Sequence, residues 1–271
     1  MKYQQFIPPV YLKDKIRYCW MLENTDSDHS QTIFKPLADG CPGIMLHQSA
    51  DGNLVQHDKK LPQIFLYGQT TRPVEIVSGG RFKTFGVVFQ PDALKSVFGI
   101  DANELTNSCT DFSWLQKSMT CQITEQISHL HSFADQSAFL FNSIFALVNK
   151  SKCNKDSSVA YAISQIATSK GHVDFKNLLT CLQLSERTFE RRFKQSVGIS
   201  PKLFARICKF QAALELLRMN KYEKLSDIAF ESEYADQSHF IRAFREFSGF
   251  SPYQYQKRTN EVAENFITFF S

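Results

Sequence analysis

The stretch Ser185–Pro201, SERTFERRFKQSVGISP, is followed 51 residues later by Asp236–Pro252, DQSHFIRAFREFSGFSP. The two stretches share two phenylalanines, basic residues and a closing Gly-x-Ser-Pro at matched positions. Each begins with a residue that caps helix N-termini, and each closes with a glycine that ends one helix and a Ser-Pro pair that begins the next. The repeat therefore predicts two copies of one short, capped helix with a basic face.

Each copy is predicted to be the second helix of a helix-turn-helix unit. Apolar residues spaced three or four apart predict a short helix ahead of each copy, capped by Asp174 in the first unit and by Ser226 in the second. We expect the units at 174–197 and 226–248, joined by a helix over about 201–219. The region after the joining helix is thus expected to repeat the region before it.

The two repeated helices each have an apolar face and a polar face. Two phenylalanines lie four residues apart in each copy, so each pair shares one face and is expected to pack inward. These pairs are Phe189 with Phe193 and Phe240 with Phe244. The outward faces carry Arg187, Glu190, Arg191 and Lys194 in the first copy, and Ser238, His239, Ile241, Arg242 and Arg245 in the second. Such faces suit the major groove of DNA, where arginine bonds guanine and glutamate accepts from cytosine.

The joining helix sets the distance between the two units. A helix of 19 residues over 201–219 is roughly 28 Å long, and successive major-groove openings on one face of B-DNA lie about 34 Å apart. One chain is therefore predicted to fill two consecutive major grooves. Basic residues beside the two outward faces are predicted to contact phosphates, which fix register rather than sequence: Lys194, Lys202, Arg206, Lys209, Arg245, Lys257 and Arg258.

The net charge of +4 is unevenly distributed. Residues 1–155 hold 15 Lys and Arg against 14 Asp and Glu, whereas residues 156–258 hold 16 against 11. The excess positive charge therefore lies in the repeated region. A solvated basic face accounts for an excess of this size equally well, so the charge alone does not indicate DNA binding.

The first ninety residues favour β-strands. Residues 16–23 alternate between two faces and predict a half-buried strand. Further strands are expected at 43–48, 53–57, 63–69, 74–78 and 82–90, separated by turn residues such as Ala38-Asp39-Gly40 and Ser78-Gly79-Gly80. The pattern is typical of a small sandwich or barrel.

The periodicity becomes helical after residue 111. Apolar residues predict helices over 112–130 and 136–149, the second capped by Asp135, and the two are expected to form an antiparallel hairpin at about 111–149. The polar stretch KSKCNKDSS is interpreted as a linker. The predicted organisation is a β-rich domain over 1–150, a linker over 151–158, an all-α double helix-turn-helix domain over 159–258 and a tail over 259–271.

The repeated region resembles the DNA-binding domain of the AraC/XylS family of transcription regulators. The resemblance is carried by LSERTFERRFKQSVGISPKLFAR, residues 184–206, and by IAFESEYADQSHFIRAFREFSGFSPYQYQKR, residues 228–258. It implies base contacts from Arg187, Glu190 and Arg191 in the first unit, and from Ser238, His239, Ile241 and Arg242 in the second. The glycine usual in each turn between the helices is Gln183 in one unit and Glu233 in the other, which predicts local backbone strain.

A second resemblance covers KPLADGCPGIMLH, residues 35–47, and LYGQTTRPVEI, residues 66–76. These segments are similar to the β-rich sensor region of one branch of these regulators. The resemblance implies an α+β fold overall, with a cupin-like β-barrel and helical hairpin before the all-α domain. It identifies no effector.

The sequence offers no pattern that supports catalysis, a cofactor or a metal site. His47 and His57 lack the further ligands of a metal-binding cupin, and Cys41 has no histidine partner at a recognisable spacing. Seven scattered cysteines without a CxxC pair indicate a reducing cytosol rather than disulfides. The start of the chain lacks the apolar segment of a signal peptide, and the most apolar run, 139–148, is too short to cross a bilayer.

We therefore expect a cytoplasmic regulator that is not an enzyme, binds double-stranded DNA and does not bind membranes. Further expected partners are a second copy of the chain, a small-molecule effector and, for an activator, RNA polymerase. Two alternatives stay open. The barrel is a cupin-type enzyme or ligand carrier with secondary DNA binding, or it is only a dimerisation module.

Overall fold

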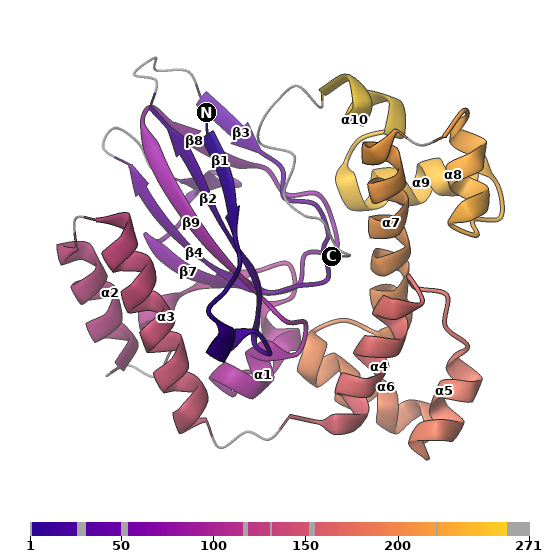
Figure 1. Cartoon of the computed structure of the whole chain (residues 1–271), viewed down its shortest axis with the longest axis horizontal. Helices are drawn as coiled ribbons and strands as arrows, with labels where there is room; N and C mark the ends of the chain where they lie inside the picture. The colour runs from indigo at the N-terminus through magenta and orange to yellow at the C-terminus, as the bar shows by residue number, and fades with distance from the viewer. Residues whose placement is uncertain are drawn as a thin grey trace.

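The structure is a computed structural model that describes residues 2–25, 31–49, 54–115, 119–130, 132–151, 155–220 and 222–258. Figure 1 shows a β-rich N-terminal part flanked on one side by two long helices and on the other by a helical C-terminal part. The predicted α+β class and the order of its two parts are confirmed.

The described strands of the N-terminal part pair into two separate sheets. The larger has six antiparallel strands in the order β1 (Lys2–Phe6), β2 (Ile16–Asn24), β9 (Phe82–Phe89), β4 (Gly43–Ser49), β7 (Ile64–Tyr67) and β10 (Cys109–Asp111). The smaller has the order β3 (Gln31–Phe34), β8 (Ile76–Gly79), β5 (Val55–Gln56) and β6 (Lys59–Lys60). The β-rich prediction is confirmed, but the barrel is not closed by hydrogen bonds.

Strand β2 is buried on both faces rather than on one. Tyr18, Trp20 and Leu22 belong to the core between the sheets, whereas Cys19 faces a second core beneath helices. A register shift between Ile16 and Tyr18 turns Ile16 into that second core, away from the other residues of its parity. The half-buried interpretation was wrong because helices cover the face that alternation had left to solvent.

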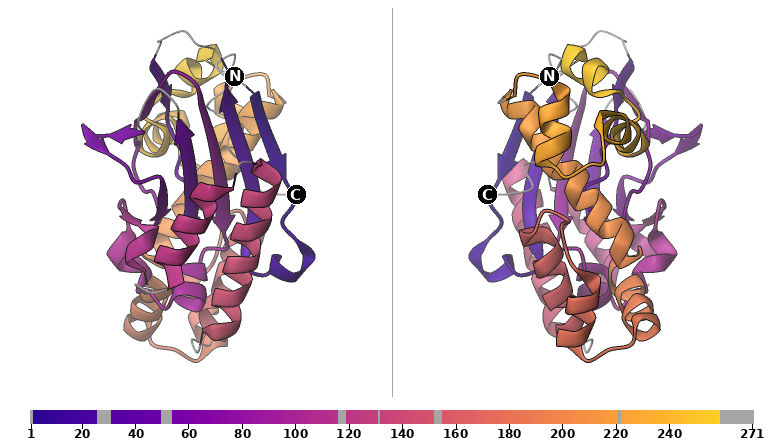
Figure 2. Two further views of the ribbon diagram at one scale, coloured as in Figure 1. Left: turned by 90° about the vertical axis from the view of Figure 1, so that its left-hand side faces the viewer. Right: turned by 90° about the vertical axis from the view of Figure 1, so that its right-hand side faces the viewer.

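Those covering helices are α1 (Ala93–Phe98), α2 (Met119–His129) and α3 (Phe133–Lys150), as the left view of Figure 2 shows. Helices α2 and α3 contact each other, so the predicted hairpin is confirmed. Its first helix is shorter than expected, since a 3-10 turn, η3 (Phe112–Trp114), precedes residues 116–118, which lie outside the described part. Ser132 caps α3 by accepting from the Asp135 N–H, so the assignment of that cap to Asp135 was wrong. Two further 3-10 turns are η1 (Val10–Leu12) and η2 (Ala102–Leu105).

The described residues of the C-terminal part form helices joined by short turns, without strands. Its elements are α4 (Ser157–Thr168), α5 (Phe175–Leu182), α6 (Glu186–Val197), α7 (Pro201–Met219), α8 (Leu225–Glu231), α9 (Gln237–Ser248) and α10 (Pro252–Arg258). The predicted tail at 259–271 lies outside the described residues. Helix α7 has the expected 19 residues and crosses between the two predicted units (Figure 2, right view).

One apolar core runs through both parts of the chain. It joins side chains between the two sheets, such as Trp20 and Phe65, to those around α7, such as Phe204 and Phe210. The N-terminal part is therefore packed against the helical region through a shared core.

Candidate nucleic-acid interface

The two helix-turn-helix units, α5 with α6 and α8 with α9, begin and end their helices as the sequence predicts, with one exception. Asp174, Ser185 and Asp236 each accept a hydrogen bond from a backbone N–H of the first turn. The exception is α8, which begins at Leu225 and not after Ser226. Asp227 of α8 instead accepts from the backbone N–H groups of the residues before it, because its carboxylate reaches back over the first turn.

The inward phenylalanines fix both repeated helices to α7. Phe189 and Phe193 contact each other, and Phe193 contacts Phe204 of α7 at a centroid distance of 5.7 Å. In the second unit, Phe244 contacts Phe210 of α7 at 5.3 Å. One helix thus holds both units through aromatic contacts, and the predicted inward faces of α6 and α9 are confirmed.

All but one of the side chains predicted to read bases are exposed. Arg187, Glu190, Arg191, Ser238, His239 and Arg242 are exposed, whereas Ile241 is half-buried against the core. Arg191 donates to Gln195 one turn along α6, and the ring of His239 packs on Tyr234 at 5.4 Å. Neither outward face is sealed by other described residues, so both are accessible to a duplex.

Three of the residues predicted to contact phosphates have internal partners. Lys202 pairs with Glu186 at 3.1 Å, Arg206 pairs with Glu246 at 2.5 Å, and Lys209 donates to the Glu233 carbonyl at 2.9 Å. A phosphate must compete with these carboxylates and with that carbonyl. Lys194 and Arg245 are exposed, Lys257 lies over the ring of Tyr253, and the side chain of Arg258 is outside the described part.

The two turns between helices adopt the strained backbone that the missing glycines predict. Gln183 has φ 53° and Glu233 has φ 50°, both in the left-handed region. The Glu233 carboxylate lies 2.7 Å from His172 Nδ1, on the loop between α4 and α5. Burial lowers the pKa of His172, and Lys209 lowers it further, while Glu233 raises it. His172 therefore links the loop that precedes the first unit to the turn of the second.

Contacts from the N-terminal part to the helical region were not predicted from the sequence. Thr106, just after η2, donates to the Gly198 carbonyl at the end of α6 at 2.7 Å. Gly198 has φ 96°, and a Cβ there would lie 2.9 Å from both the Ala102 carbonyl oxygen and Thr106 Oγ1. Glycine at 198 is thus required twice, by the turn and by the close approach of η2. Only its helix-ending role is visible in the sequence.

A second contact joins the N-terminal part to α7 and α9. Segment 35–42 lies outside the sheets and is called the strap below. The Ala38 carbonyl accepts from Gln211 of α7, and the Ala38 N–H donates to the Phe247 carbonyl of α9 at 3.4 Å. Lys35 lies over the ring of Phe250 at 4.7 Å. The strap therefore touches the end of the second unit, while η2 touches the end of the first.

The described residues hold no cluster of three or more metal-ligating side chains. His47 is buried and bonds Thr84 at 2.7 Å, and burial lowers its pKa to about 4. Cys41 is buried on the strap, and burial raises the pKa of its thiol to about 12. A thiol that stays protonated is not an activated nucleophile.

Comparison with known proteins covers both parts of the chain. Residues 178–258 match a family described as a helix-turn-helix domain. Residues 178–258 are an AraC/XylS-type helix-turn-helix domain. Residues 4–111 match a family described as a domain of unknown function (DUF6597). Within the described part, no helix has both the length and the apolarity to cross a bilayer.

Two curated relatives are similar to part of this chain. An uncharacterised HTH-type transcriptional regulator of Haemophilus influenzae is 31% identical over 114 residues, 42% of this chain and 36% of the relative. The HTH-type transcriptional activator RhaS of Klebsiella pneumoniae is 36% identical over 69 residues, 26% of this chain and 24% of the relative. The matched segment thus spans well under half of each relative's length.

Among solved structures, ToxT from Vibrio cholerae is similar, with 13% identity and a TM-score of 0.49 over 94% of this chain and 98% of that chain. The AraC-like transcriptional activator CuxR is 12% identical, with a TM-score of 0.23 over 81% of this chain and 87% of that chain.

Proposed function

We propose that this chain is a sequence-specific transcription regulator that binds double-stranded DNA with both helix-turn-helix units. The observation that carries the proposal is the pair of exposed polar faces on α6 and α9, each fixed by phenylalanines to the same helix, α7. The AraC-type match of residues 178–258 supports it. The base contacts proposed are those named from the sequence, with Arg187 and Arg242 central to the two units.

The test begins with the full chain and a pool of random duplexes, from which the preferred site is selected. Arg187→Ala and Arg242→Ala should each weaken binding to that site by about 1–3 kcal/mol and relax the base preference at one position each. Lys59→Ala, which removes an exposed cation from β6, is the matched control and should bind as the wild type does. If both arginine variants keep the affinity and the base preference, these residues do not read bases.

The phosphate contacts are tested by their dependence on salt. Lys202→Ala should weaken binding to all duplexes about equally and should lower the slope of log affinity against log salt by about one. A change in base preference without a change in salt slope would contradict a phosphate contact.

We also propose a homodimer formed through the N-terminal part. Ile7, Val10 and Tyr11 around η1 are exposed, and Tyr11 contacts Phe145 of α3 at 5.1 Å. This apolar surface includes the predicted hairpin. Val10→Asp should shift the sedimentation coefficient towards the monomer, whereas Ile33→Asp, at a half-exposed position on β3, should not. A monomeric wild type would rule out this dimer.

The proposal extends to an effector that binds between the two sheets, in a cytoplasmic protein. A cavity of about 90 Å³ lies there, lined mostly by apolar and aromatic side chains from β2, β4, β7 and β9. This cavity favours a sensor over a module that only dimerises. A cupin-type enzyme is the weaker candidate, because no described metal-ligating cluster accompanies the cavity.

A further inference from the structure

The cavity between the sheets has one ionisable wall residue with a negative charge and, among the described residues, no cationic one. Its wall includes the aromatic rings of Tyr18, Trp20, Phe65 and Tyr67, and the carboxylate of Asp39. No described Lys, Arg or His lines it. An anionic ligand placed there would meet no cationic side chain in the described wall to offset its loss of water.

Asp39 presents a carboxylate to this apolar space. It is only 8% exposed, its Oδ1 atom accepts from the Cys41 N–H at 3.0 Å, and no described side chain donates a hydrogen bond to it. Burial raises the pKa of Asp39 to about 6, while the Cys41 N–H and the Arg17 charge lower it. A buried carboxylate with spare acceptor capacity favours a ligand that donates a hydrogen bond.

The size of the cavity limits the ligand and identifies the wall that must yield. A volume of about 90 Å³ is smaller than the roughly 150 Å³ of an apolar cavity that holds benzene. One wall is the six-stranded sheet, whose central strands are paired on both sides. The wall also includes Pro36, Leu37 and Asp39 of the strap, which belongs to neither sheet. A single-ring ligand would therefore displace the strap more readily than the sheet.

We propose that the cavity binds an uncharged, single-ring aromatic molecule that donates a hydrogen bond to Asp39, and that its binding shifts the strap and thereby the second helix-turn-helix unit. The aromatic wall suits a ring in edge-to-face contact. The strap reaches the helical region through Ala38, which bonds Gln211 of α7 and the Phe247 carbonyl of α9. This inference rests on the proposed regulator function only for its effect on DNA.

Ligand binding is tested without DNA, on the full chain, with three probes that share one ring. Benzyl alcohol donates a hydrogen bond, toluene does not, and benzoate carries a negative charge. Titration calorimetry should show benzyl alcohol binding at least tenfold more tightly than either of the others. Tighter binding of benzoate, or no binding of any probe, would overturn the proposed ligand class.

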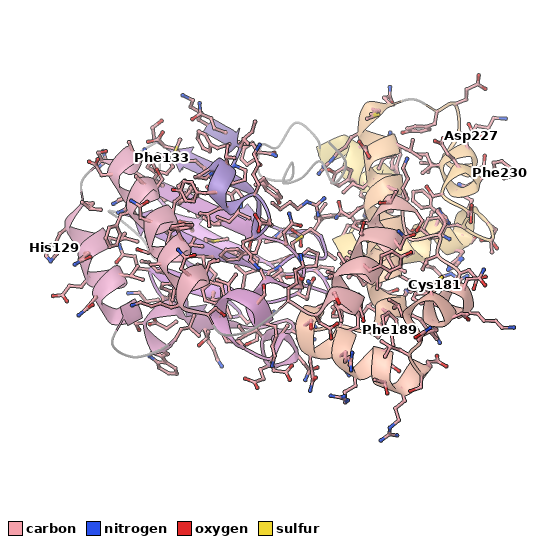
Figure 3. The ribbon with its side chains drawn as sticks, turned by 60° about the horizontal axis from the view of Figure 1, so that its bottom comes forward. His129, Phe133, Cys181, Phe189, Asp227 and Phe230 are labelled. Atoms are coloured by element: carbon pink, nitrogen blue, oxygen red, sulfur yellow. The ribbon has the colours of Figure 1, made fainter. Side chains whose placement is uncertain are left out.

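The location is tested by the reactivity of a thiol in the wall. Cys109 lines the cavity, whereas Cys181 is exposed on α5 at the far end of the molecule (Figure 3). Benzyl alcohol should slow the alkylation of Cys109 by iodoacetamide at least threefold and leave that of Cys181 unchanged. Equal rates at Cys109 with and without benzyl alcohol would place the ligand elsewhere.

Two variants of lining residues test the role of Asp39 and the position of the site. Asp39→Asn should reduce the preference for benzyl alcohol over toluene to less than threefold. Val74→Phe adds a larger side chain at another lining position and should abolish the protection of Cys109, which keeps the test decisive if Asp39→Asn does not fold. Protection that survives in Val74→Phe would contradict the site.

The coupling is tested with Gln211→Leu, which changes the strap contact but no wall residue. Benzyl alcohol should change the affinity of the wild type for its selected duplex at least threefold. It should change the duplex affinity of Gln211→Leu by less than half as much. The affinity of Gln211→Leu for benzyl alcohol, measured by calorimetry, should equal that of the wild type. An equal ligand effect in both proteins would overturn the coupling. A wild type that binds the ligand but no duplex would refute the regulator function and leave the ligand site standing.

Discussion

The first helix-turn-helix unit, α5 with α6, and the second, α8 with α9, differ most in the turn between their helices. One residue, Leu184, separates the left-handed Gln183 from the cap Ser185, whereas two separate the left-handed Glu233 from the cap Asp236. The repeat offset is therefore 51 residues in α6 and α9 but 50 in the helices before them. The extra residue is accommodated in the turn, and α6 and α9 keep the same length of 12 residues.

The surroundings of the two turns differ as well. Glu233 is bound to His172 and Lys209, whereas no described side chain bonds that of Gln183. On the preceding helix, the exposed Thr180 of the first unit corresponds to Phe230 of the second, whose side chain is 87% exposed (Figure 3). The two units thus share the capped second helix and the aromatic core, while their turns and outer surfaces have diverged.

The largest expected effect tests whether the two cores are equivalent. Phe193 and Phe244 are fully buried and contact α7 through Phe204 and Phe210. Phe193→Ala and Phe244→Ala should each lower the free energy of unfolding by about 3–5 kcal/mol, measured by urea unfolding. Phe230→Ala, at an exposed position, should change it by less than about 0.5 kcal/mol. A loss below about 1 kcal/mol at either buried site would show that the two cores are not equivalent.

The next effect compares the contacts that hold each unit to the N-terminal part. Thr106→Val removes the hydrogen bond to the Gly198 carbonyl of the first unit, and Gln211→Leu removes the bond to the strap that contacts the second. Each should cost about 1 kcal/mol in the free energy of unfolding. Thr32→Val, at a half-buried position on β3, is the control. A cost in only one variant would show that the N-terminal part holds a single unit.

A smaller effect separates the two turns. Gln183→Gly should stabilise the protein by about 0.5–1 kcal/mol, because glycine adopts the left-handed backbone without strain at a modest entropic cost. Glu233→Gly gains the same relief but loses the pairing with His172, so its stability should rise by less. Thermal unfolding of both variants measures the difference. A greater gain in Glu233→Gly would mean that the His172 pairing contributes nothing.

The smallest effect is a pH dependence of stability that comes from His172, the partner of Glu233 in the second turn. Burial and Lys209 lower the pKa of His172, so the folded state binds its proton less well than the unfolded state does. The stabilisation from neutral His172 is present above the ordinary pKa of about 6.5 and is lost as the pH falls below it. Unfolding by urea between pH 7.5 and 5.5 should show this loss, and His172→Gln should reduce it. If stability rises as the pH falls, and His172→Gln removes that rise, the predicted direction of the pH dependence is wrong.

The sequence predicts the C-terminal region well because its signals are local. The caps Asp174, Ser185 and Asp236 and the closing glycines act within one turn of a helix, so each can be recognised from neighbours in the chain. The N-cap at Ser226 was misplaced because the aspartate after it binds the preceding backbone instead.

The N-terminal region was predicted less completely because its structure depends on partners distant in the chain. The short strands β3 and β10 pair with residues more than forty positions away in the sequence, and α1 is only six residues long. The burial of Cys19 follows from packing under helices more than seventy residues away. The contacts of the strap and of Thr106 could not be predicted for the same reason, because their partners lie 173 and 92 residues away in the sequence.

We propose that α6 and α9 occupy consecutive major grooves of one duplex. The most direct test measures the affinity of the full chain for its selected site after five base pairs are inserted between the two contacted elements. Five base pairs place the second element on the opposite face of the helix, so the account predicts that affinity falls to that of a site with one element destroyed. An affinity unchanged by the insertion of five base pairs would contradict simultaneous binding by the two units.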